Sequence, residues 1–409
     1  MNNFSTYLSE AKNTHMMHIE NALLYQGVKG TEQAIKALED IFDALKGHTT
    51  GDKIITQKYD GAPAVFAGPD PQTGEFFVAK KSIFNTEPKV YKSENEIKAD
   101  TTGDLADKLI AAYKYLKPLN LDKIYQGDIM FTQNDLKAET IDGEKYITFH
   151  PNTIVYAVPA DSDFGKKLKT YKLGIVFHTV YTGKTFQSLT AGFNIDVDQY
   201  KNNANVWIED AYVKDVAGKV SLSAGDSKDV NDAIVTAKKL YSKLNRGILK
   251  QIEDDQDLAR DIETFQNSFI RSGIEVTNTA KHVQDLINWF DSRFEKEKEA
   301  RKSEKGKESI SVKQKERMAF FSKENQVNLK ALFDLQRAMI IAKTLLFNQL
   351  DRVGQLDTFL KTTDGFKVTG TEGFVISDKI GNAYKLVDRM EFAKSNFSKD
   401  IIKGWQRDS

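Results

Sequence analysis

The chain of 409 residues contains no cysteine. It therefore forms no disulfides, binds no zinc through thiolates and uses no cysteine nucleophile. It also lacks an excess of charge of one sign, because 58 Lys and Arg residues balance 58 Asp and Glu residues. No global basic field marks a nucleic-acid partner, so any surface for such a partner must be local.

Long apolar runs are also missing: no run of about 18 apolar residues, the length of a membrane-spanning helix, occurs in the sequence. The first residues, Met1 to Ser5, do not have the charged and apolar regions of a secretory signal. We therefore expect a soluble cytoplasmic protein without a membrane partner. Its length allows two compact domains, or one domain with a large insertion.

One short stretch between two apolar runs has the composition of a site. The segment 54–68 contains Lys58-Tyr59-Asp60-Gly61, with apolar residues before and after it. This pattern predicts two antiparallel strands bent around Asp60 and Gly61, with the Lys58 ammonium projecting into a cleft. A lysine that merely caps a hairpin is the structural alternative.

Apolar spacing divides the rest of the chain into helical and strand-rich parts. A period of three to four predicts helices over 14–47 and through most of 200–360. Shorter apolar runs predict strands between 53 and 195, one of them over 123–131, with a helix near 103–117 among them, and strands again from 366. We therefore divide the chain into 1–199, with N-terminal helices and the first part of a strand-rich domain, a helical insertion over 200–360, and the last strands with a C-terminal tail over 361–409.

Several of the predicted strands contain a charged residue inside an apolar run. Asp128 lies in such a run, and Glu372 and Lys385 lie in short apolar strands near the C-terminus. The paired lysines Lys80 and Lys81 interrupt another strand. Charges next to apolar runs are costly unless a site uses them, so these residues are candidates for a functional cleft.

Taken together and in order, these segments resemble the covalent nucleotidyltransferase superfamily of ATP-dependent DNA ligases, RNA ligases and messenger RNA capping enzymes. Within it, the chain is most similar to a phage ligase. The resemblance covers about 1–195 and 365–395. It is carried by Lys58-Tyr59-Asp60-Gly61, Ala79-Lys80-Lys81-Ser82, Gln126-Gly127-Asp128, Gly174-Ile175-Val176-Phe177, Glu372-Gly373-Phe374-Val375 and Tyr384-Lys385-Leu386.

The resemblance implies an α+β fold, the nucleotidyltransferase or ATP-grasp-like ligase adenylation fold. It consists of antiparallel sheets with flanking helices, here with a large α-helical insertion. It also implies that Lys58 attacks the α-phosphate of ATP to form lysyl-AMP, which requires a neutral amine. Mg²⁺ would be held by Asp128 and Glu372, since magnesium prefers carboxylate and phosphate oxygens.

The remaining roles that the resemblance implies concern the nucleotide. Asp60 would contact the ribose or the metal, Phe177 would stack on the adenine, and Lys385 would touch the α-phosphate. Phe177 as an ordinary core residue is the alternative. The full set of expected nucleotide-binding residues is Gln57, Asp60, Gly61, Lys80, Lys81, Asp128, Phe177, Glu372 and Lys385.

The chain departs from the family pattern in three places. Pro63 stands where many DNA ligases have an arginine, and Val387 replaces a second lysine in the last motif. Only a short tail follows Lys385, so we expect no C-terminal OB-fold. The helical insertion, with its charged run from Arg293 to Arg317, is the candidate to contact a duplex in its place, although the same run is also typical of a solubilising face made of a helix end and a flexible loop.

We therefore predict an ATP-dependent DNA ligase that seals 5′-phosphate to 3′-hydroxyl ends. Its partner would be a nicked duplex, of DNA or of a DNA/RNA hybrid, and the protein would act as a monomer in the host cytoplasm if a phage encodes it. An RNA ligase on the same scaffold is the closest alternative. A capping enzyme fits less well because it normally carries an OB domain, and a catalytically idle nucleic-acid-binding protein would have no use for the strand-borne charges.

Overall fold

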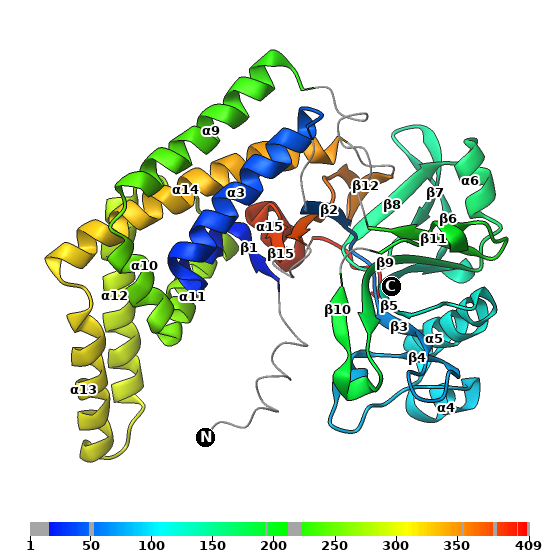
Figure 1. Cartoon of the computed structure of the whole chain (residues 1–409), viewed down its shortest axis with the longest axis horizontal. Helices are drawn as coiled ribbons and strands as arrows, with labels where there is room; N and C mark the ends of the chain where they lie inside the picture. Colours follow the sequence, from blue (N-terminus) through cyan, green and yellow to red (C-terminus); the bar gives the residue numbers. More distant parts are fainter. Residues whose placement is uncertain are drawn as a thin grey trace.

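A computed structural model describes residues 16–48, 53–192, 195–211, 222–352, 356–378, 383–398 and 400–406. The fold is α+β, as expected, with three β-sheets and a large helical region. In Figure 1 the helical region with α3 and α9 to α14 occupies the left of the molecule, and two of the sheets, with α4, α5 and α6, the right. Within the described ranges, every helix is too short or too polar to span a lipid bilayer.

The first sheet joins the two ends of the described chain. Its strand order is β1-β15-β14-β2, with β1 parallel to β15 and the other neighbours antiparallel. In Figure 1 this sheet lies between the helices and the other sheets. The strands are β1 (Met17–His18), β2 (Lys53–Lys58), β14 (Gly373–Asp378) and β15 (Ala383–Leu386).

The second sheet has the order β10-β9-β5-β3-β4, and β11 pairs with β9 in parallel. One face packs against α5, whose residues Leu109, Ala112 and Leu116 are fully buried. The strands are β3 (Ala64–Pro69), β4 (Phe76–Ala79), β5 (Ile124–Thr132), β9 (Leu173–Thr182), β10 (Thr190–Gly192) and β11 (Val206–Asp210). The neighbouring helices are α4 (Glu94–Asp100), α5 (Gly103–Leu116) and α7 (Asp198–Lys201).

The third sheet is antiparallel, with the order β13-β12-β8-β7-β6. Its strands are β6 (Lys137–Ile141), β7 (Glu144–Phe149), β8 (Ile154–Pro159), β12 (Asp357–Thr362) and β13 (Gly365–Val368), and α6 (Asp163–Leu168) follows β8. Short 3₁₀ helices connect other elements: η1 (Ile19–Asn21), η2 (Lys81–Phe84), η3 (Lys117–Leu119), η4 (Gln133–Asp135) and η5 (Phe186–Ser188).

The helical region is built from α2 (Ala22–Tyr25), α3 (Gly27–Leu45), α9 (Ala224–Lys243), α10 (Arg246–Asp254), α11 (Gln256–Arg271), α12 (Thr279–Glu299), α13 (Glu304–Ala319), α14 (Lys323–Asp351) and α15 (Arg389–Phe397). From α9 to α14, each helix begins after a side chain that accepts a hydrogen bond from a backbone N–H in the first turn. Such caps satisfy donors that a helix leaves free and so fix its start. The capping residues are Ser223, Asn245, Asp255, Asn278, Ser303 and Ser322.

One continuous hydrophobic core joins the helices to the first sheet. Ile55, Phe374 and Leu386 point from the sheet into the same cluster as Leu38 of α3 and Leu346 of α14. The expected boundaries at 199 and 360 therefore do not separate independent units. β11 follows the first boundary and belongs to the second sheet, while β12 spans the second boundary.

The expected hairpin around Asp60 and Gly61 is wrong. β2 pairs with β14 in the first sheet, whereas β3 pairs with β4 and β5 in the second. The chain thus crosses from one sheet to the other directly after Lys58. The charged run from Arg293 to Arg317 also differs from the expected loop, because α13 forms there and lies against α12 (Figure 1).

Candidate active site between two sheets

The first sheet has one apolar face and one polar face. Ile55, Phe374 and Ile376 face the helical core, so period-two alternation turns Thr56, Lys58 and Val375 the other way. There they meet the second sheet across a cavity of about 90 Å³. Its lining consists of Met16, Thr56, Gln57, Lys58, Tyr59, Asp128, Val176, His178, Thr179, Ala211, Val375 and Ser377.

Lys58 and Glu372 form a close ion pair at this cavity. The ammonium of Lys58 donates to Oε1 of Glu372, and the backbone pairing of Lys58 with Gly373 brings the two residues together. Only 6% of the Glu372 side chain is exposed, and its Oε2 has no hydrogen-bond partner among the described residues. Burial raises the pKa of Glu372 to about 7, and the charges of Asp60 and Asp128 act in the same direction.

Asp128 supplies a second carboxylate from the opposite sheet. Burial raises its pKa to about 7, although the positive charge of Lys58 opposes the change. His178 Nε2 lies 3.8 Å from Asp128 Oδ2. Burial lowers the pKa of His178 to about 4, and the charge of Lys58 lowers it further, so the imidazole is neutral at pH 7. Asp128, which lines the cavity, and Glu372, which is bonded to Lys58, are thus two buried carboxyls near one ammonium group.

Lys385 adds a cation from β15, where it stands opposite Val375. Burial lowers the pKa of Lys385, and the positive charge of Lys58 lowers it further. Glu372 acts in the opposite direction. The structure thus brings Lys58, Glu372, Asp128 and Lys385 into one electrostatic group, from four segments that are separate in the sequence.

Asp60 anchors a turn. Its Oδ1 accepts from Asn152 Nδ2 at 2.8 Å, and its Oδ2 accepts from the backbone N–H groups of Thr153 at 2.7 Å and Ile154 at 2.9 Å. These three hydrogen bonds occupy most of the roughly four acceptor sites of the carboxylate and leave one on Oδ1. Asp60 therefore holds the turn between β7 and β8 beside the site.

Gly61 allows the crossing strand to approach β5 closely. A Cβ at this position would lie 2.5 Å from the Cβ of Asp128 and 2.9 Å from the sulfur of Met130. These distances are too short for real carbon atoms, so any larger residue would push the crossing away from Asp128. Gly61 acts through its small size and sets the place of the Asp128 carboxylate.

A model of a family of unknown function, DUF6267, matches residues 13–401. The chain belongs to this family. Comparisons with curated proteins and with solved structures gave no match.

Phe177 does not have the expected place. Its side chain is 0% exposed and packs in the core under α5, with its ring centroid 5.4 Å from that of Tyr125. A ring buried on that face cannot stack on an adenine in the Lys58 cavity. The ring on the cavity side belongs to the next residue, His178, whose side chain is 28% exposed.

The other expected residues divide between the cavity and its surroundings. Gln57 lines the cavity, and its backbone N–H donates to the carbonyl of Ala211 at 2.6 Å. Lys80 lies 3.5 Å from Asp100 and over the ring of Tyr91. Lys81 is exposed at the start of η2. Among the described residues that line the Lys58 cavity, neither lysine of this pair occurs.

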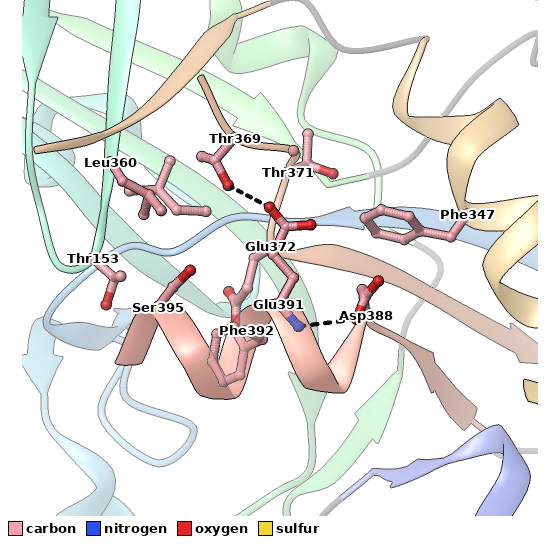
Figure 2. Close-up of a pocket in the computed structure, with 12 residues that line it drawn as sticks. Thr153, Phe347, Leu360, Thr369, Thr371, Glu372, Asp388, Glu391, Phe392 and Ser395 are labelled. Atoms are coloured by element: carbon pink, nitrogen blue, oxygen red, sulfur yellow. Dashed lines mark hydrogen bonds between the residues drawn. The ribbon is translucent and has the colours of Figure 1, made fainter. Parts of the chain in front are cut away.

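Glu372 borders a different, smaller cavity of about 30 Å³ on the side of α15. Figure 2 shows Thr369 and Thr371 on one side of it and Glu391, Phe392 and Ser395 of α15 on the other. Glu372 is linked to the Lys58 cavity through its hydrogen bond with the Lys58 ammonium. Sequence reasoning missed Ser377, whose buried hydroxyl at the Lys58 cavity has no partner within the described ranges. A hydroxyl in an otherwise apolar strand was the available signal.

Proposed function

We propose that the chain is an ATP-dependent polynucleotide ligase, with DNA as its substrate, that seals 5′-phosphate to 3′-hydroxyl ends through a lysyl-AMP intermediate. The observation that supports it is the pairing of the Lys58 amine with a buried carboxylate whose pKa is raised to about 7. Catalytic lysines and carboxyls with altered pKa values are typical of active sites in clefts.

In the first step, the Lys58 nitrogen attacks the α-phosphorus of ATP. A nitrogen–phosphorus bond forms, the bond to the bridging oxygen breaks, and pyrophosphate leaves with the electron pair. Lys58 must give up a proton for this attack. Glu372 is hydrogen-bonded to the amine and ionises near neutral pH, so it is placed to accept that proton.

The residues present fit a magnesium ion only together with a nucleotide. No set of three or more His, Asp and Glu side chains in the described part of the chain is grouped to hold a metal. Magnesium is often bound by one or two carboxylates plus substrate phosphates. Asp128 and the unpartnered Oε2 of Glu372 offer those carboxylates. When bound, the ion would supply positive charge against the phosphates.

Binding of ATP also requires the cavity to widen. Ligand pockets usually measure about 300–1,000 Å³, whereas the space beside Lys58 is about 90 Å³. The two sheets meet there through side chains that include Met16 and Tyr59. Because the first and second sheets face each other across the Lys58 cavity, a small movement of one sheet away from the other would enlarge the cavity without breaking strand pairing within either sheet.

The helices α12 and α13 are the proposed duplex contact. Between Arg293 and Arg317 the chain has ten Lys and Arg residues against six Glu residues. Part of this charge is paired within the protein, as between Arg317 and Asp255 or Lys307 and Glu304. The lysines that remain on the outer surface can neutralise backbone phosphates without reading bases. They include Lys302, Lys305, Lys313 and Lys315.

The test is self-adenylation with α-labelled ATP and Mg²⁺. The wild-type protein should retain an acid-labile AMP on Lys58. Lys58→Ala and Lys58→Arg should abolish the label, while Lys145→Ala, a change at an exposed strand lysine, should not. Equal labelling of the Lys58 variants would overturn the proposal, and so would a wild-type protein that takes no label, as expected of an idle binding protein. Sealing of a nicked duplex is then measured in its DNA, RNA and hybrid forms, and the form that is sealed distinguishes a DNA ligase from an RNA ligase.

A further inference from the structure

A second large cavity lies in the helical region, away from Lys58. It measures about 400 Å³ and is bordered by α11, α14, the segment 272–278 and the start of α15. This volume is within the usual range of small-molecule sites, about 300–1,000 Å³. Its walls are mainly apolar: Phe269, Ile270, Ile274, Phe333, Ile340 and Ile341.

Buried polar groups form part of the lining. Glu20 is 0% exposed, and its Oε1 accepts from Lys343 Nζ at 2.8 Å and from Arg389 Nη1 at 3.5 Å. Burial would raise the pKa of Glu20, but Lys343, His18 and Arg389 hold it at about 2, so the carboxylate is charged at neutral pH. Its Oε2 has no hydrogen-bond partner among the residues that the structure describes.

His282 provides a second unsatisfied group. Its side chain is 3% exposed and packs among aromatic rings, including those of Phe269 and Phe333. Its Nδ1 also has no partner in the described part of the chain. Buried polar atoms without partners are rare in proteins and are usually satisfied by water or a ligand.

The charges around the cavity cancel. Three acidic residues line it, Glu20, Glu275 and Asp388, and three basic residues balance them, Arg337, Lys343 and Arg389. A ligand with a net charge would meet repulsion without a compensating excess of the opposite sign. An uncharged ligand with one donor would satisfy Glu20 and cover the apolar walls.

We propose that this cavity binds a small uncharged molecule with an apolar alkyl or aromatic body and a hydroxyl group, which donates a hydrogen bond to Oε2 of Glu20. The site is separate from the Lys58 cavity, but the short segment from His18 to Glu20 connects it to the first sheet. Glu20 comes two residues after His18, and His18 pairs with Lys385 in the first sheet. The proposal does not depend on the adenylation chemistry.

Binding can be measured by calorimetry with three probes of one shape: 4-ethylphenol, ethylbenzene and 4-ethylbenzoate. A hydrogen bond to a charged group is worth about 1.5–3 kcal/mol, or roughly a tenfold or greater difference in affinity. We expect 4-ethylphenol to bind at least about tenfold more tightly than ethylbenzene, and the carboxylate to bind more weakly than the phenol. Equal affinity of phenol and hydrocarbon, or no binding of the phenol at millimolar concentration, would refute the proposal.

The location is tested with a bulky substitution in the wall. Ile340→Trp places a large ring at a residue that lines the cavity and is 39% exposed, so the change is tolerated by the fold. Val327→Trp is the matched control, since Val327 is on the same helix, is 68% exposed and lies outside the cavity lining. Phenol binding should disappear in the first variant and persist in the second. If Ile340→Trp binds the phenol as the wild type does, the site is elsewhere.

Discussion

Asp128→Asn should stabilise the protein at alkaline pH. Burial raises the pKa of Asp128 from 3.8 to about 7, so the folded chain keeps a proton that the unfolded chain loses above about pH 4. The free energy of unfolding therefore falls as the pH rises from about 4 to about 7. Asparagine is neutral at every pH and does not carry this penalty.

The size of the effect follows from the change in pKa. Each pKa unit is worth about 1.4 kcal/mol, so full ionisation of the folded carboxyl would cost up to about 4 kcal/mol. Because 23% of the Asp128 side chain is exposed, water screens part of this cost. We expect Asp128→Asn to be more stable than the wild type by roughly 2 kcal/mol at pH 8, with the difference shrinking toward pH 4.

Urea unfolding in buffer without divalent metal, at pH 5, 6.5 and 8, measures this difference. Asp161→Asn is the control, because Asp161 is an exposed residue in a turn, and should change stability little at each pH. A less stable Asp128→Asn variant at pH 8 would place Asp128 in a stabilising ion-pair network instead. A difference that does not change with pH would also refute the reasoning.

Three further predictions concern the reaction and its substrates. Self-adenylation should rise between pH 6 and 8 with an apparent pKa near 7, because the ionised form of Glu372 accepts the proton; Glu372→Gln should lower the rate by about 100-fold or more and remove this dependence. Phe177→Leu should lower the free energy of unfolding by about 1 kcal/mol without changing the KM for ATP. His178→Ala should raise that KM. A KM raised by Phe177→Leu and unchanged by His178→Ala would instead place the adenine against Phe177. Changing four exposed lysines of the α12–α13 segment to Gln should reduce the salt slope of nicked-duplex binding by about 0.9 for each phosphate that the protein no longer neutralises and leave self-adenylation intact, while an unchanged slope would exclude this surface. Those lysines are Lys302, Lys305, Lys313 and Lys315, with Lys239 and Lys243 of α9 as the matched controls.

Local elements were predictable because their signals are local. The spacing of apolar residues predicts a helix near 103–117, and α5 covers Gly103–Leu116. The apolar run over 123–131 predicts a strand, and β5 covers Ile124–Thr132. Glycine turns and short apolar runs likewise predict β14 and β15. Each of these elements is determined by neighbours within about ten residues.

Strand pairing was harder to predict because it depends on distant segments. The runs on either side of Asp60 look like a hairpin, yet β2 pairs with β14, far along the chain. The Asp60 carboxylate does not close a hairpin; it accepts a hydrogen bond from the Thr153 N–H in the turn between β7 and β8. Nothing in the local pattern distinguishes a strand that returns from one that enters another sheet.

The orientation of the β9 side chains also could not be predicted from the sequence. Phe177 and Val176 are both buried, on opposite faces, so alternation does not reveal which face meets the cavity. The register of the pairing with β5 shifts between Gln126 and Gly127. Gln126 pairs with Thr179 and Gly127 with Phe177, so His178, which lies between them, has no paired residue in β5. Such shifts arise from tertiary packing and re-aim side chains near functional sites.

The pairing of β2 with β14 has a consequence for synthesis of the protein. Lys58 leaves the ribosome early, but Glu372 and Lys385 follow it by more than three hundred residues. At about 5–20 residues per second, these strands emerge many seconds after Lys58. A nascent chain therefore holds Lys58 without the carboxylate that would take its proton in the proposed reaction. If that proposal is correct, adenylation would begin only after the whole first sheet has been made, so incomplete chains released by stalled ribosomes would be inert rather than trapped as adenylates.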